Sequence, residues 1–96
     1  MIAVLAEIHV KAGEEAEFEE AVRVFAAHVR DNEPGNRQYR LGKSRRTPRL
    51  YTMIESYSDA EALEAHAKSE HFRAFSTTIG SLLEQAPRIE YLDVVC

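Results

Sequence analysis

The residues of this chain best suited to acid–base chemistry near neutral pH are two of its four histidines. His66 follows Leu63 by three residues on the inner side of a predicted helix, so its ring can point toward a predicted sheet. His71 lies further along, beside Phe72 and Phe75. Both histidines are candidate catalytic residues, because an imidazole can act as a general base in this pH range. Taken alone, each pattern favours the alternative of a structural histidine, capping or buried with its hydrogen bonds satisfied.

Glu55 is a third candidate for a chemical role, because it is a carboxylate in a strand that is otherwise apolar or aromatic. It stands between Met53 and Tyr57 in the alternating pattern. A buried carboxylate is costly unless it is hydrogen-bonded or paired, and burial raises its pKa. Such a group can orient a histidine or a substrate hydroxyl. Two structural interpretations remain equally open: Glu55 faces solvent, or it pairs with an arginine across a dimer interface.

The sequence lacks the common motifs of metal and nucleophile sites. His66 and His71 are five residues apart, whereas helical ligand pairs prefer spacings of three or four. Neither an H-E-x-x-H motif nor an Asp-rich loop occurs, and Cys96 is the single cysteine. A glycine-rich phosphate loop and a G-x-S-x-G motif are also absent. We therefore expect no metal and no nucleophilic serine.

Positive charge gathers in one segment of the chain. Six of the twelve lysines and arginines lie between residues 37 and 49, and no acidic residue occurs between Glu33 and Glu55. This segment could attract an anionic substrate. It could also carry charge that prevents edge-to-edge aggregation of a hairpin, which is the interpretation we favour. The six residues are Arg37, Arg40, Lys43, Arg45, Arg46 and Arg49.

Hydrophobic periodicity predicts the first four elements. Alternating apolar residues indicate a strand over 2–10, and apolar residues at helical spacing indicate a helix over 14–32. Two further strands, over 37–45 and 49–57, flank Thr47-Pro48 and are expected to form a hairpin.

The remainder of the chain is predicted to be helical until a last strand. An S-x-x-E capping box that begins at Ser58 predicts a helix starting at Asp59. Ser69 is expected to cap a continuation that Pro87 stops, before a final strand over 89–95. The order β-α-β-β-α-β predicts an α+β ferredoxin-like fold, a four-stranded antiparallel sheet with helices on one face.

Both faces of the predicted sheet carry large apolar residues, although this fold should leave one face solvated. No other part of so short a chain is available to cover the second face. We therefore predict a homodimer in which two sheets pack together; the alternative is a monomer with a mildly apolar open face. The opposed residues are Val4 with Leu5, Tyr51 with Ile54, and Tyr91 with Leu92.

Length and composition exclude several classes of protein. The 96 residues are expected to form a single domain over 1–96, and 45% hydrophobic content is too apolar for a disordered chain. A net charge of −4 argues against general nucleic-acid binding. The longest apolar run, Met1–Ala6, is too short for a membrane span, and the first residues do not resemble a signal peptide. A cytoplasmic location is the expectation.

Several of these segments resemble the antibiotic biosynthesis monooxygenase domain family. The resemblance begins in the run 2–13 and continues in Glu33-Pro34-Gly35 and in the strand that holds Glu55. It is most specific in E-x-H at 64–66 followed by S-x-H-F at 69–72. These segments cover essentially the whole chain.

The resemblance implies a dimeric α+β barrel with a pocket between helices and sheet. It implies that three catalytic and four substrate-binding residues line this pocket. Some members oxidise dihydroquinones or polyphenols without a cofactor, and others are quinol oxidases, isomerases or haem degraders. The absence of tryptophan argues against haem degradation. The implied catalytic residues are His66, Glu55 and His71, and the implied substrate-binding residues are Phe72, Phe75, Tyr51 and Tyr57.

By this resemblance, the expected function is that of a cofactor-independent monooxygenase or quinol oxidase. A small aromatic substrate and molecular oxygen would react without flavin or metal, after His66 takes a proton from a phenolic hydroxyl. One alternative is an isomerase of a small phosphorylated ketose of the autoinducer-2 type. The cationic hairpin, together with Tyr57 and Pro87-Arg88, resembles that branch. Another alternative is a non-catalytic, ligand-binding, stress-responsive dimer.

Overall fold

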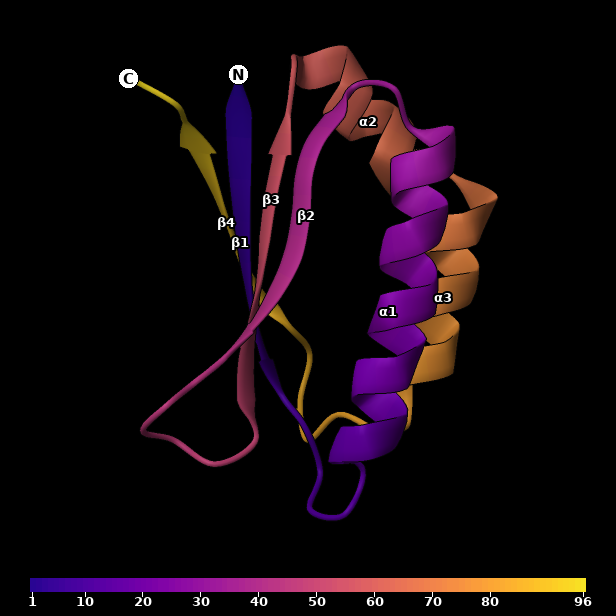
Figure 1. Cartoon of the computed structure of the whole chain (residues 1–96), viewed down its shortest axis with the longest axis vertical. Helices are drawn as coiled ribbons and strands as arrows, with labels where there is room; N and C mark the ends of the chain where they lie inside the picture. Colours follow the sequence, from indigo (N-terminus) through magenta and orange to yellow (C-terminus); the bar gives the residue numbers. More distant parts are fainter.

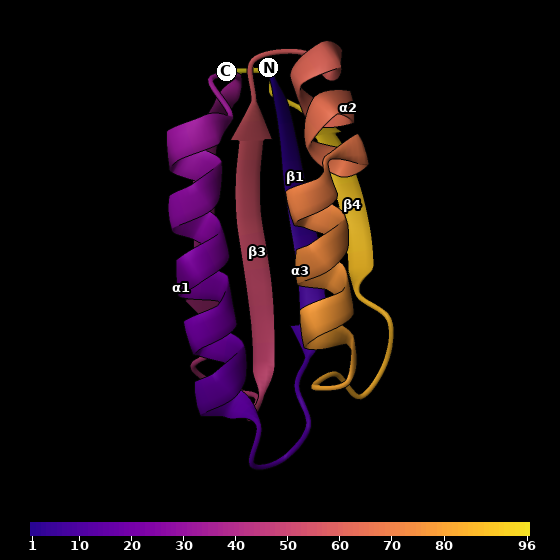
Figure 2. The same ribbon diagram turned by 90° about the vertical axis from the view of Figure 1, so that its right-hand side faces the viewer.

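The computed structural model describes residues 1–96 as one antiparallel sheet with three helices on one of its faces (Figures 1 and 2). The strands are β1 (Ile2–His9), β2 (Asn36–Lys43), β3 (Leu50–Tyr57) and β4 (Arg88–Asp93). The helices are α1 (Glu15–Asn32), α2 (Ala60–Lys68) and α3 (Glu70–Gly80). The strand order is β2-β3-β1-β4. The predicted α+β ferredoxin-like fold is confirmed.

The core lies between the sheet and the helices because each presents a continuous apolar face there. In β1 the buried residues are Val4, Ala6 and Ile8, and their partners in β3 are the residues with odd numbers. This alternation follows from the two-residue period of a strand. Helix α1 adds one buried stripe at helical spacing, which consists of Phe18, Val22, Phe25, Ala26 and Val29.

Two predicted boundaries of the helical region are wrong. Asp59, not Ser58, caps α2, because the Asp59 carboxylate accepts a hydrogen bond of 2.8 Å from the Ala62 N–H. The Ser58 N–H instead donates to the Gly35 carbonyl, which ties α2 to the turn after α1. Helix α3 ends at Gly80 and does not reach Pro87. The chain after Gly80 pairs with the end of β1, so its backbone groups find partners outside a helix.

The sheet face away from the helices is partly apolar, as the alternation predicted. Register places Leu5 beside Ile54, and both residues belong to the face that no helix covers. Ile54 is 37% exposed and Leu92 is 39% exposed.

None of the three helices combines the length and the apolar character needed to cross a lipid bilayer.

Gly35 lies where the turn after α1 contacts α2, and a side chain there has no room. A Cβ atom on Gly35 would lie 2.4 Å from the Ala62 Cβ. Neither atom is the flexible end of a side chain, so the backbone must shift. We expect Gly35→Ala to lower the free energy of unfolding by about 1–3 kcal/mol, measured by urea denaturation.

Gly80→Ala is the matched control for this substitution. A Cβ on Gly80 would have no neighbour within 4 Å, and the residue is helical. Alanine there is expected to be neutral or to stabilise the protein by up to about 1 kcal/mol. Equal effects of the two substitutions would show that the turn and α2 are not in close contact.

Candidate functional site

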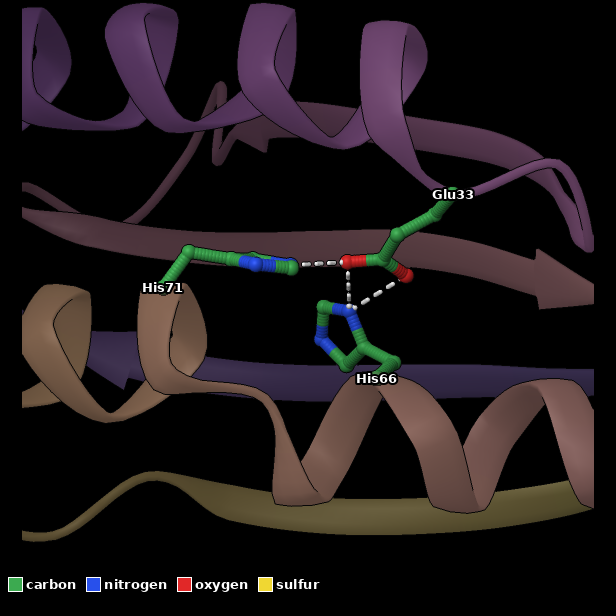
Figure 3. Close-up of side chains that lie close together, drawn as sticks. All are labelled: Glu33, His66 and His71. Carbon is green, nitrogen blue, oxygen red and sulfur yellow. Dashed lines mark hydrogen bonds and ion pairs between the residues drawn. The ribbon is translucent and has the colours of Figure 1, made fainter.

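Three ionisable side chains from three different elements converge on one point (Figure 3). Glu33 follows the end of α1, His66 lies in α2 and His71 lies in the first turn of α3. The Nδ1 atom of His66 is 2.9 Å from both carboxylate oxygens of Glu33. The Nε2 atom of His71 is 2.5 Å from Glu33 Oε2. Glu33 therefore joins the two histidines into a single cluster.

The break between α2 and α3 brings the two histidines together. In one continuous helix, five residues correspond to a rotation of about 140°, so the rings would point to different sides. Ser69 interrupts the helix with an extended backbone, at φ −69° and ψ 150°. Its hydroxyl oxygen then caps α3 by accepting from the Phe72 N–H. The predicted cap at Ser69 is confirmed, and it removes the spacing argument against a shared site.

His66 also forms part of the wall of a cavity of about 180 Å³ between the sheet and helices α2 and α3. The histidine side chain is 4% exposed, so the surrounding protein holds it away from bulk water. Most of the wall is apolar, and the residues in it that carry polar groups include His66, Glu55, Tyr39 and Ser76. The larger apolar residues around the cavity are Val4, Ile8, Met53, Leu63, Phe72, Phe75, Ile79, Ile89 and Tyr91.

Glu55 faces the helices, because it is paired with Val4 on the inner side of the sheet. Its Oε1 atom accepts a hydrogen bond of 2.7 Å from the Tyr57 hydroxyl. Burial raises the pKa of Glu55, and the hydrogen bond from Tyr57 only partly opposes this shift. Glu55 therefore places a carboxyl group with increased proton affinity at the cavity wall.

The raised pKa of Glu55 makes stability depend on pH. The folded state holds this proton more tightly than the unfolded state, so the stabilisation is complete below the unfolded pKa, about 4.5. It is lost as pH rises through the higher folded pKa. Glu55→Gln carries no such proton. We expect its stability relative to the unmodified chain to increase with pH, by at most about 1.4 kcal/mol per pH unit.

Urea denaturation of both proteins across this pH range measures the difference. Parallel stability curves would contradict the burial of an ionisable Glu55.

The structure brings some of the predicted site residues together and separates others. Phe72 and Phe75 line the cavity with His66 and Glu55. His71 lines a groove on the outer side of α1 and α3, and its ring is 4.4 Å from that of His28.

The two predicted tyrosines lie outside the cavity. Tyr57 is completely buried beside Glu55 and does not line it. Tyr51 lies at the other end of β3, where its hydroxyl donates a hydrogen bond of 2.6 Å to Glu19. It lines a different groove, of about 570 Å³, between α1 and β2.

Residues 1–78 match the model of the antibiotic biosynthesis monooxygenase family. The chain belongs to this family. The structural neighbours place its fold in the dimeric α+β barrel type.

The chain is similar to several solved structures over nearly its whole length. A protein from Caulobacter crescentus, described as a candidate antibiotic biosynthesis monooxygenase, is 37% identical with a TM-score of 0.95, over 98% of this chain and 89% of that one. PA3566 from Pseudomonas aeruginosa is 33% identical with a TM-score of 0.85, over 99% and 94% of the two chains. A similarly described Nitrosomonas europaea protein has a TM-score of 0.90 at 21% identity, over the full length of both chains, which shows the fold alone. No curated protein matches the chain.

Glu33 is the residue of the cluster that the sequence did not predict to belong to the site. Its partners follow it by 33 and 38 residues, so no local pattern connects them. One signal was present in the sequence. A carboxylate at the C-terminal end of a helix lies at the negative end of the helix dipole, where it is disfavoured. A glutamate that occupies such a position has a partner that compensates for this cost.

Proposed function

We propose that this chain is a cofactor-independent monooxygenase or quinol oxidase that acts on a dihydroquinone or polyphenol. The observation that carries the proposal is the Glu33–His66 pair at the wall of an apolar cavity. A histidine whose far nitrogen is held by a carboxylate is the usual arrangement of a positioned general base.

The orientation of His66 supports this role. An ionised carboxylate only accepts hydrogen bonds, so Glu33 holds the proton on Nδ1 and leaves the Nε2 lone pair free. We infer that Nε2 takes the proton of a phenolic hydroxyl bound in the cavity. As an oxidase, the anion supplies two electrons to oxygen, and the quinol yields a quinone and hydrogen peroxide. As a monooxygenase, the dihydroquinone itself supplies four electrons: one oxygen atom replaces a ring hydrogen to give a hydroxyquinone, and the other leaves as water with two hydrogens of the substrate.

The remaining polar groups of the cavity are suited to hold such a substrate. In our proposal, the Glu55 carboxyl and the Tyr39 hydroxyl bind the second hydroxyl of the aromatic ring, while Phe72 and Phe75 contact its faces. The cavity supplies orientation and excludes water, and the reactivity toward oxygen belongs to the substrate.

The charge of the cavity favours an aromatic substrate over a phosphorylated sugar. None of the residues that line it is an arginine or a lysine. The cationic residues of the hairpin lie elsewhere: Arg40 and Lys43 line the groove between α1 and β2, together with Arg23 and Arg30 of α1. A phosphate group in the cavity would have no cationic partner, and its desolvation would be costly.

We also propose that the active form is a homodimer. Leu5, Ile54 and Leu92 give the open sheet face an apolar centre. Ile89 and Tyr91 line the cavity but are 48% and 61% exposed, so the wall formed by β4 is open to solvent. A second copy that covers the sheet and its β4 edge would complete the enclosure of a substrate.

Oxygen uptake by the chelator-treated protein with a panel of dihydroquinones tests the proposed function. We expect uptake well above that of a protein-free control, which accounts for autoxidation. Saturable binding of the same compounds without uptake would contradict an enzyme and would identify a ligand-binding protein. Uptake that requires added metal would contradict the cofactor-independent mechanism.

A further inference from the structure

We propose that Glu33, His66 and His71 form a binding site for a divalent first-row transition-metal ion. Their donor atoms, one carboxylate oxygen and two imidazole nitrogens, all lie within 4.8 Å of one another. The three donors come from residues at or next to the ends of three separate helices (Figure 3). Two imidazoles and one carboxylate are a common ligand set of zinc and of non-haem iron in proteins.

The distances in the cluster indicate donors that converge on a common centre. His66 Nδ1 is 2.9 Å from both oxygens of Glu33. Glu33 Oε2 also receives His71 Nε2 at 2.5 Å. Around an ion with bonds of about 2.1 Å, neighbouring donors lie about 3.0–3.4 Å apart. The two nitrogen–oxygen pairs therefore need to open by less than about 1 Å to admit such an ion, while the two imidazole nitrogens, which lie within 4.8 Å of each other, adjust to the same range.

The surroundings of the cluster favour a cation. The two histidines are the only ion-pair partners of the Glu33 carboxylate. No lysine or arginine forms a salt bridge with it. The Phe25 ring lies 6.0 Å from the His66 ring and 5.8 Å from the His71 ring, which shields one side from water. The His71 side chain is 24% exposed, and it provides a route for an ion from solvent.

The donor chemistry selects the class of ion. Magnesium and calcium prefer sites made entirely of oxygen donors, whereas two imidazole nitrogens favour zinc, iron, cobalt, nickel or copper. Three protein ligands leave at least one coordination position for water.

Occupancy of the site would change His66, and this consequence rests on the proposed function. An ion bound to Nδ1 leaves the imidazole proton on Nε2, which then has no lone pair to accept a phenolic proton. A bound ion would therefore inhibit the cofactor-independent reaction. The binding site itself does not depend on that reaction.

Cobalt binding to the full chain, stripped of metal with a chelator, tests the proposal without any measurement of turnover. We expect saturation at one Co²⁺ per chain, with visible ligand-field absorption that Zn²⁺ abolishes by displacement. Zn²⁺ should also raise the midpoint of thermal unfolding as its concentration increases. Glu33→Gln and His71→Ala should each weaken Co²⁺ binding more than about tenfold, because each removes a direct ligand.

His28→Ala is the control, because His28 contacts His71 but is not one of the three ligands. It should retain the affinity for Co²⁺. The proposal is overturned if the chain binds no Co²⁺, or if His28→Ala abolishes binding while Glu33→Gln does not. Absence of binding would leave the proposed reaction untouched, and the absence of oxygen uptake would leave the metal site untouched. Circular dichroism of each metal-free variant separates a lost ligand from a lost fold.

Discussion

Replacing His66 by alanine is expected to lower oxygen uptake with the best dihydroquinone by about 10²–10⁴-fold, the usual contribution of a positioned general base. The variant has no nitrogen at the cavity wall to accept the phenolic proton. The loss should appear in kcat and in kcat/KM alike, because the proton transfer belongs to the transition state. Initial rates of oxygen consumption, corrected for autoxidation, measure the effect.

The variant also leaves Glu33 without one of its partners, so its folding must be measured beside its activity. His66 is 4% exposed, and removal of a buried ring destabilises the core. His66→Gln keeps a polar group of similar length but cannot serve as a base at neutral pH, and it should show the same loss of turnover. His28→Ala is the matched control, because His28 does not line the cavity. Full turnover by a folded His66 variant would assign proton transfer to another group.

Replacing Phe25 by alanine is expected to lower the free energy of unfolding by about 3–5 kcal/mol. The Phe25 ring is stacked on Phe75 at 4.1 Å and 5°, and it meets the edge of Tyr39 at 5.5 Å. Because it also contacts both histidine rings, the cavity left by alanine would lie directly beside the candidate site. A loss of this size is a large part of the 5–15 kcal/mol typical of a small domain.

Chemical denaturation of Phe25→Ala beside Val24→Ala measures this contribution. Val24 precedes Phe25 in α1 but is 65% exposed, so its truncation should change stability by less than about 0.5 kcal/mol. A loss below about 1 kcal/mol in Phe25→Ala would show that α1 does not support the site through this ring.

The fold could be predicted from sequence because its signals are local. Alternation in β1 and β3 and the apolar stripe of α1 each lie within one element, and burial on one side follows from the period. Errors occurred at ends of elements, where competing partners decide. Ser58 and Asp59 are both good capping residues, and in the structure the Asp59 carboxylate accepts from the Ala62 N–H, while the Ser58 N–H donates to distant Gly35.

The candidate site could be predicted only in part from such local patterns. Glu55 and Tyr51 lie on the same face of β3, but four residues of strand separate them by about 13 Å, so only Glu55 reaches the cavity. His66 was predicted from its helix face. Its environment was not, because the polar partner at its far nitrogen comes from the end of another helix.

By itself, the sequence determined the element order, the apolar faces of the strands and helices, and the inward direction of His66, whereas the direction of Glu55 stayed open. Tertiary structure alone decided that Glu33 joins His66 to His71, and that Arg40 and Lys43 of the cationic segment line a separate groove. The physical reason is the range of each interaction. Periodicity is set by backbone geometry over a few residues, whereas the site depends on side chains that only the packing of α1 against α3, and of both on the sheet, brings within hydrogen-bond distance.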